Sequence, residues 1–245
     1  MDGDLLGRLR DRLQELCSVP TLPAGWYCVS ATLAAEGFRF GGDFFVADLV
    51  DLPSGPGLQM VLVDVCGSGD TALPDAVQFA GALGGLIGVV PPQEVMAAAN
   101  RFLLRQPSDE ATATAAQVVL DLATGGYVIR SAGHPPVLRW DSAASAWSVD
   151  TARGTALGVV DEPALELSDG LLAPGEALLF YTDGVVESRE LDIEDGIAWL
   201  RAVARDAFLA DVDGAPAAIL EQVSRGDDDR AVLFIGRRPA DHLIG

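Results

Sequence analysis

The 245-residue chain contains no lysine, only two histidines and only three cysteines. Its sixteen basic residues are therefore all arginines, and 36 acidic residues outnumber them, which gives a formal net charge of −20. Nucleic acids and anionic membranes both require a positive surface, so we expect neither as a general partner. Three cysteines cannot build a disulfide framework, and their spacing is not that of a zinc site.

Long apolar runs are also absent. The longest nearly apolar segment, residues 76–90, includes Gln78 and four glycines and is too short to cross a bilayer comfortably. The first twelve residues carry several charges and are unlike a secretory signal. We therefore expect no membrane association and a cytoplasmic location, where free cysteines are usual. The apolar share of 49% is that of a folded globular chain.

Leucines recur at helical spacing near the N-terminus, between residues 4 and 17. The pattern predicts a helix that ends before Pro20, and its apolar face could pack on the core or form a homodimer contact. We expect an N-terminal helix over residues 1–20, one domain over 21–238 and a tail over 239–245.

The remaining pattern predicts a single α+β domain, with strands first, then two helices, more strands, two further helices and a last strand. Helices are expected at 72–89, 93–105, 196–209 and 216–223. Strands are expected at 26–34, 38–50, 59–65, 115–122, 127–132, 137–140, 147–149, 177–181 and 231–236.

Aspartates stand at or near one end of four of these apolar strands: Asp43, Asp64, Asp183, and the pair Asp228 and Asp229. Carboxylates at such positions are costly to desolvate, and several in one place repel one another. A divalent cation with a preference for oxygen, Mg²⁺ or Mn²⁺, would resolve both problems. Each aspartate alone is weak support, because the chain has five Asp-Gly pairs and such pairs commonly mark turns.

The ordered motifs resemble the metal-dependent protein phosphatases, the PPM or protein phosphatase 2C-type family, and within it the bacterial SpoIIE- and RsbU-like serine phosphatases. The resemblance runs from about residue 22 to residue 237. It is carried by GGDFF at 41–45, VDVCGSG at 63–69, SAGHPPVLRW at 131–140, LLFYTDGVVESR at 178–189 and DDRAVLFI at 228–235.

The resemblance implies a central antiparallel β-sandwich flanked by helix pairs. It also implies two Mn²⁺ or Mg²⁺ ions, bridged by the water that attacks the phosphate, at one end of the sandwich. Asp229 would be a further ligand or would orient the others. The ligands implied by the matching motifs are Asp43, Asp64, Asp183, Asp228 and the backbone carbonyl of Val65.

In SpoIIE- and RsbU-like relatives the substrate is a phosphoserine on a STAS-domain anti-sigma-factor antagonist. The resemblance therefore implies a serine/threonine phosphatase in a sigma-factor pathway. Three positions depart from the family pattern: Val46 replaces an acid, Cys66 stands where some relatives have a histidine, and Ser68 replaces a lysine. His134 is expected to order its loop, because two prolines follow it.

Two other functions remain open. The first is a nucleotide-binding kinase. Residues 64–69 read D-x-x-G-x-G, which is one residue longer than the D-x-G-x-G box of histidine-kinase-type ATPases, and no asparagine box precedes them. The second alternative is a catalytically weak or inactive phosphatase fold that regulates a partner by capturing it. Metal-dependent hydrolysis would distinguish an enzyme from such a binding module.

Overall fold

Two antiparallel sheets packed face to face form the centre of the molecule in a computed structural model, which describes residues 2–34, 42–67, 72–108, 111–187, 192–223 and 228–239. In pairing order, the first sheet consists of β1 (Trp26–Leu33), β10 (Arg230–Arg237), β9 (Ala177–Tyr181), β6 (Leu138–Asp141) and β7 (Ala146–Val149). The second consists of β2 (Phe44–Leu52), β3 (Gly55–Val65), β4 (Ala113–Asp121), β5 (Gly126–Ala132) and β8 (Leu167–Leu171).

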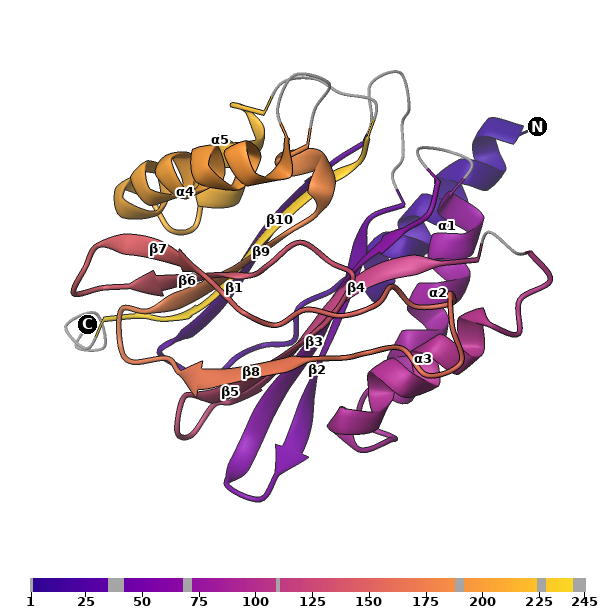
Figure 1. The fold of residues 1–245 in the computed structure, drawn as a ribbon, viewed down its shortest axis with the longest axis horizontal. Coiled ribbons are helices and arrows are strands. Elements are labelled where there is room, and N and C mark those ends of the chain that lie inside the picture. Colours follow the sequence, from indigo (N-terminus) through magenta and orange to yellow (C-terminus); the bar gives the residue numbers. More distant parts are fainter. Residues whose placement is uncertain are drawn as a thin grey trace.

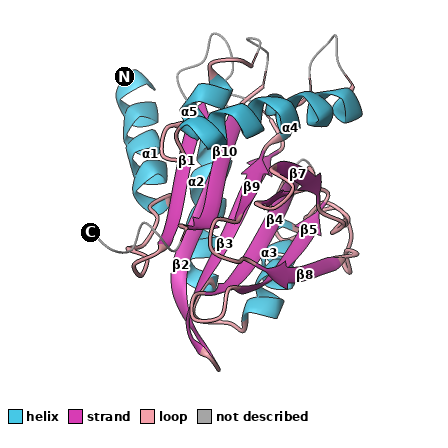
Figure 2. Cartoon of the chain, turned by 90° about the vertical axis from the view of Figure 1, so that its left-hand side faces the viewer, coloured by secondary structure: helices cyan, strands magenta, loops and turns pink. Residues whose placement is uncertain are grey.

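Helices cover the outer face of each sheet (Figures 1 and 2). The second sheet is covered by α1 (Asp2–Leu16), α2 (Leu73–Leu86) and α3 (Val95–Leu103), and the first by α4 (Ile193–Ala210) and α5 (Ala215–Leu220). Two short 3₁₀ helices, η2 (Pro92–Glu94) and η3 (Asp183–Val185), precede α3 and follow β9. The predicted β-sandwich between helical layers is confirmed.

Three apolar layers hold these elements together, and each follows from the alternation of side chains along the strands. Leu62 and Phe180 belong to the layer between the sheets. Phe79 of α2 packs with Val63 in the outer layer of the second sheet. Phe208 of α4 belongs to the outer layer of the first sheet.

The N-terminal helix is confirmed, and its apolar stripe packs within the chain. Leu13 is buried in the layer that contains α2, and Leu6, Leu9 and Leu16 pack against that layer. Leu5, at the edge of the stripe, is 53% exposed. A homodimer through residues 4–17 stays a prediction. Most of the apolar stripe already packs against the core of its own chain.

The sequence pattern missed strand β8. Its leucines, Leu167 and Leu171, face solvent, and β8 joins the sheet as an edge strand beside β5. Asp169-Gly170 lies inside this strand rather than at a turn, where such pairs commonly occur. A Cβ on Gly170 would overlap the Tyr127 ring, so the glycine allows the ring to lie across β8.

The five helices and two 3₁₀ turns in the described ranges include none with the length and apolar character that a bilayer crossing needs.

Candidate functional site

The predicted site aspartates lie at adjoining strand ends from both sheets. In the second sheet, Asp43 directly precedes β2 and Asp64 is the penultimate residue of β3. In the first sheet, Asp183 begins η3 immediately after β9, and Asp228 and Asp229 immediately precede β10. One end of the sandwich therefore carries all five.

Asp43 is surrounded by negative charge. Burial, and then the carboxylate of Asp64, raise the pKa of Asp43 well above its usual value, with smaller contributions from Asp229 and Asp183. A hydrogen bond from Thr182 acts in the opposite direction. The charged form of Asp43 is thus disfavoured wherever no cation compensates it.

The other carboxylates are perturbed in the same direction. Burial, followed by the charges of Asp183, Asp228 and Asp229, raises the pKa of Asp64 to about 8. Burial and the charge of Asp228 raise the pKa of Asp183 to about 6. Burial also raises the pKa of Asp228, although the backbone N–H of Asp229 partly offsets it. The side chains are close enough for each to oppose ionisation of the next.

Thr182 ties three segments of the site together. Its buried hydroxyl donates to Asp43 Oδ2 at 2.7 Å and accepts from the backbone N–H of Ala231 at 2.8 Å. The end of β9, the start of β10 and the residue before β2 are therefore joined by one side chain. Thr182 lies in the TDG motif, but no periodicity in the sequence marks it as functional.

A backbone N–H holds one carboxylate oxygen of Asp229. Asp229 is 3% exposed, and its Oδ2 accepts from the N–H of Gly42 at 2.6 Å. A Cβ on Gly42 would lie 2.9 Å from the Cβ of Ala72, so only glycine fits this crossing. Gly41, the first glycine of the GGDFF motif, lies outside the described residues.

Gly184 allows the two central strands to meet behind the site. A Cβ at this position would overlap the carbonyl oxygen of Asp229, whose backbone leads into β10. The Asp183-Gly184 pair therefore serves a close backbone approach as well as the tight η3 turn. Sequence alone cannot tell these two uses of an Asp-Gly pair apart.

The donor set fits a hard divalent cation by its chemistry. Clustered, partly buried carboxylates with raised pKa values are the ligands that Mg²⁺ and Mn²⁺ prefer. Across the described ranges, no three Asp, Glu, His or Cys side chains are already arranged as a metal-holding group. The side chains are therefore near one another without forming a finished cage, and the individual ligand assignments, including the carbonyl of Val65, stay predictions.

Two of the three departures from the family pattern, Val46 and Cys66, lie within the described residues. Val46 is buried against the helical layer, so an acid at this position would be buried too. The next acid along β2, Asp48, is exposed. Cys66 is exposed and its sulfur accepts a hydrogen bond from the Thr112 hydroxyl at 2.8 Å. Ser68 lies outside the described residues.

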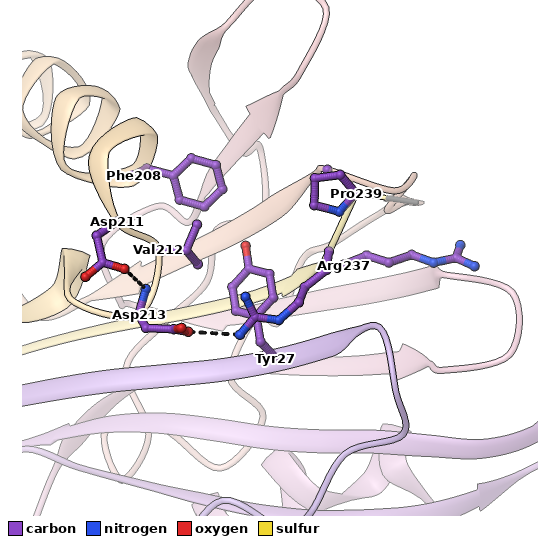
Figure 3. A pocket seen from close by; sticks show the side chains of 9 residues that line it. Tyr27, Phe208, Asp211, Val212, Asp213, Arg237 and Pro239 are labelled. Carbon is purple, nitrogen blue, oxygen red and sulfur yellow. Dashed lines mark hydrogen bonds and ion pairs between the residues drawn. The ribbon is translucent and has the colours of Figure 1, made fainter. Parts of the chain in front are cut away.

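A cavity of about 260 Å³ lies at the opposite end of β10, away from the acids. Figure 3 shows Tyr27, Phe208 and Val212 around it, with Asp213 paired to a neighbouring arginine. That arginine, Arg238, lies 3.0 Å from the Asp213 carboxylate. Arg238 and Asp213, two of the charged residues that line the cavity, are paired with each other, so we do not assign the active site to this cavity.

Two facing antiparallel sheets with helices on both outer sides define the class of the protein as the PPM phosphatase fold. The family model described as Stage II sporulation protein E (SpoIIE) matches residues 54–238. The chain therefore belongs to the SpoIIE family of PPM-type phosphatases.

Solved structures agree with this assignment. The RsbU and RsbW domains of Rv1364c from Mycobacterium tuberculosis are 30% identical to the chain, with a TM-score of 0.77, over 91% of this chain and 62% of that one. The PP2C phosphatase domain of SpoIIE from Bacillus subtilis, solved with a fragment of its regulatory domain, gives 18% identity and a TM-score of 0.72, over 88% and 64%. The chain thus spans less than two thirds of either solved chain.

RsbX, solved in complex with magnesium, gives 16% identity and a TM-score of 0.63, over 88% of this chain and 97% of that one. At this identity the likeness concerns the fold alone.

Proposed function

We propose that the protein is a metal-dependent phosphatase that hydrolyses phosphoserine or phosphothreonine in a protein substrate in the cytoplasm. The observation that carries the proposal is the cluster of aspartates from both sheets, in which burial and then mutual repulsion raise the pKa of Asp64 to about 8. A cluster that opposes its own ionisation gains most from added positive charge.

The chain would hold two Mn²⁺ or Mg²⁺ ions through five groups. When bound, such ions supply an activated water and neutralise the oxygens of a phosphoryl group. Asp229 would act as a further ligand or, through its bond to the Gly42 N–H, would fix the loop that carries Asp43. The five groups are the carboxylates of Asp43, Asp64, Asp183 and Asp228 and the carbonyl of Val65.

The described residues around these groups would position them. Thr182 orients Asp43 by donating to its Oδ2. His134 is buried and lies behind the site. The nucleophile would be water activated by the two ions.

The proposed substrate is a phosphorylated STAS-type anti-sigma-factor antagonist, and the reaction would act in a sigma-factor pathway. Membership of the SpoIIE family supports this substrate class. One solved relative combines RsbU and RsbW domains in one chain, which favours a regulatory setting. Because the chain carries a net charge of −20, an acidic phosphoprotein would need a local docking patch near the cations.

The test is release of phosphate from a phosphoserine-containing antagonist by the purified full chain, with Mn²⁺ and with EDTA. We expect hydrolysis only with Mn²⁺. Asp64→Asn should lower it at least about 100-fold, the upper end of losses seen when a metal ligand's supporting residues are removed. Asp213→Asn, which removes a carboxylate at the other end of β10, is the matched control and should retain activity.

Each alternative predicts a different result. A binding module would bind the phosphorylated antagonist without releasing phosphate, with or without Mn²⁺. Hydrolysis of another phosphoprotein but of no antagonist would retain the chemistry and refute the pathway.

A further inference from the structure

His134 lies directly behind the aspartate cluster, in the space between the two sheets. The residue is 4% exposed, and its Nδ1 is 2.9 Å from the hydroxyl of Thr114. Thr114 is the β4 residue that pairs with Asp64 of β3. Paired residues of antiparallel strands project side chains from the same face, so the threonine adjoins the aspartate.

The other side of the ring adjoins the first sheet. The backbone of Tyr181 is close enough to favour the charged form of the ring, although Nε2 has no hydrogen-bond partner of normal geometry. Tyr181 is the last residue of β9, and the next residue, Thr182, donates to Asp43. His134 therefore stands between Thr114 of β4, which pairs with Asp64, and the end of β9.

The chain holds this histidine in place by several local devices. Gly133 has a φ of +68°, and a Cβ there would lie 3.0 Å from the backbone nitrogen of Ala156. The carbonyl of His134 accepts from the Ser131 hydroxyl at 3.3 Å. Two prolines follow and restrict the backbone further. So many local constraints would hold one ring in one orientation.

The ring carries no charge toward the aspartates. Burial lowers the pKa of His134 to about 4, so the imidazole is neutral near neutral pH. A neutral imidazole can accept a hydrogen bond at one nitrogen, which suits the Thr114 hydroxyl as the donor. His134 is thus suited to orient a neighbour and unsuited to act as the counter-ion of the cluster.

We propose that His134 is a positioning residue: by accepting from Thr114, it fixes the start of β4 beside Asp64 and orients that carboxylate toward a divalent cation. The inference rests on the proposed function in so far as Asp64 is a ligand. A ring that merely fills space between the sheets would affect stability alone.

The test compares Mn²⁺ dissociation constants, measured calorimetrically at neutral pH on the full chain, together with thermal unfolding midpoints. Thr114→Val keeps the shape of the side chain and removes the hydroxyl, and we expect it to weaken Mn²⁺ binding about 10- to 100-fold, as for other residues that orient ligands. Thr114→Ser restores the hydroxyl and should restore most of the affinity.

Trp26→Phe provides the control for loss of a buried hydrogen bond in the same inter-sheet layer. It removes the 2.9 Å bond from the indole N–H to the carbonyl of Leu122, which directly follows β4 at the end away from Thr114. We expect a lower unfolding midpoint and an unchanged Mn²⁺ dissociation constant.

The outcomes separate the two proposals. Equal affinity in the unchanged protein and Thr114→Val would overturn the positioning role, whatever the midpoints. Mn²⁺ binding that depends on Thr114, without hydrolysis of any phosphoprotein, would support the positioning role and refute the phosphatase. An unchanged protein that binds no Mn²⁺ would overturn both.

Discussion

Strand β10 begins beside Asp228 and Asp229 and ends at Arg237, so its two ends, about 26 Å apart by the length of an eight-residue strand, can be compared directly. At the start, burial and then the charges of neighbouring carboxylates from four strand ends raise the pKa values of these aspartates. At the far end, Arg238 lies 3.0 Å from the Asp213 carboxylate and 5.3 Å from the centre of the Tyr27 ring.

The difference concerns compensation of charge rather than amount of charge. The arginine end contains a cavity, yet its cations already have an acid and aromatic rings as partners, including Trp26 beneath Arg237. At the acid end, repulsion among the carboxylates exceeds the attraction that Arg230 provides for Asp228. Carboxylates that oppose one another's ionisation favour the binding of a cation, whereas the paired charges at the arginine end are explained by packing alone.

The largest effect is expected from Asp43→Asn, which removes one carboxylate from the acid end of β10. The variant can still accept from Thr182 but lacks one of the proposed metal ligands, so Mn²⁺-dependent hydrolysis should fall at least about 100-fold. Without metal, the variant should be more stable than the unchanged protein by about 1–3 kcal/mol, the cost of a poorly compensated buried group. Urea unfolding with EDTA measures the second effect.

A variant of equal or lower metal-free stability would show that the acid end is compensated after all. The activity loss alone would not distinguish these cases, so both measurements are required.

The second prediction concerns pH and the neutral histidine behind the acids. Folding lowers the pKa of His134 from 6.5 to about 4, so the neutral ring stabilises the native state above pH 6.5. That contribution is lost as the pH falls through about 4, and it amounts to about 3 kcal/mol in total. His134→Asn removes the titrating ring.

Urea unfolding from neutral pH to pH 4 should therefore show a shallower loss of stability in His134→Asn than in the unchanged protein. Parallel curves would mean that His134 is not held neutral by burial.

The third prediction contrasts two glycines. Gly184→Ala would place a Cβ on the carbonyl oxygen of Asp229, so the strands behind the site must separate. We expect a loss of about 1–3 kcal/mol in stability together with weaker Mn²⁺ binding. Gly81→Ala in α2 meets nothing within 4 Å and should stabilise the protein by up to about 1 kcal/mol.

Thermal unfolding and Mn²⁺ titration of both variants provide the measurement. If Gly81→Ala were the more damaging variant, the close approach at Gly184 would not be what holds the site together.

These contrasts also show which parts of the fold the sequence could predict. Strands with continuous apolar runs, such as β3 and β9, were predicted because both of their faces are buried. Strand β8 was missed because an edge strand joins by backbone hydrogen bonds and can expose leucines such as Leu167. The apolar pattern of a sequence indicates which residues are buried, so it does not detect a strand whose apolar side chains stay exposed.

The candidate site shows the same limit. Aspartates beside apolar strands are conspicuous in sequence, because charge beside a buried strand needs a reason. Thr182 and Thr114 are not conspicuous, since threonine is common in strands and a single hydroxyl alters no pattern. Their roles depend on which strands become neighbours, and that follows from topology rather than from local spacing.

The smallest expected effect tests the arginine end itself. Asp213→Asn removes the partner of Arg238, but both side chains are more than a third exposed, so the ion pair contributes at most about 1 kcal/mol. Stacking of the guanidinium on Tyr27 remains in the variant and limits the loss further. We expect a slightly lower unfolding midpoint at low salt, no difference at high salt, and unchanged Mn²⁺ affinity. A change in Mn²⁺ affinity would mean that the two ends of β10 are coupled, and the charge at one end could no longer be interpreted without the other.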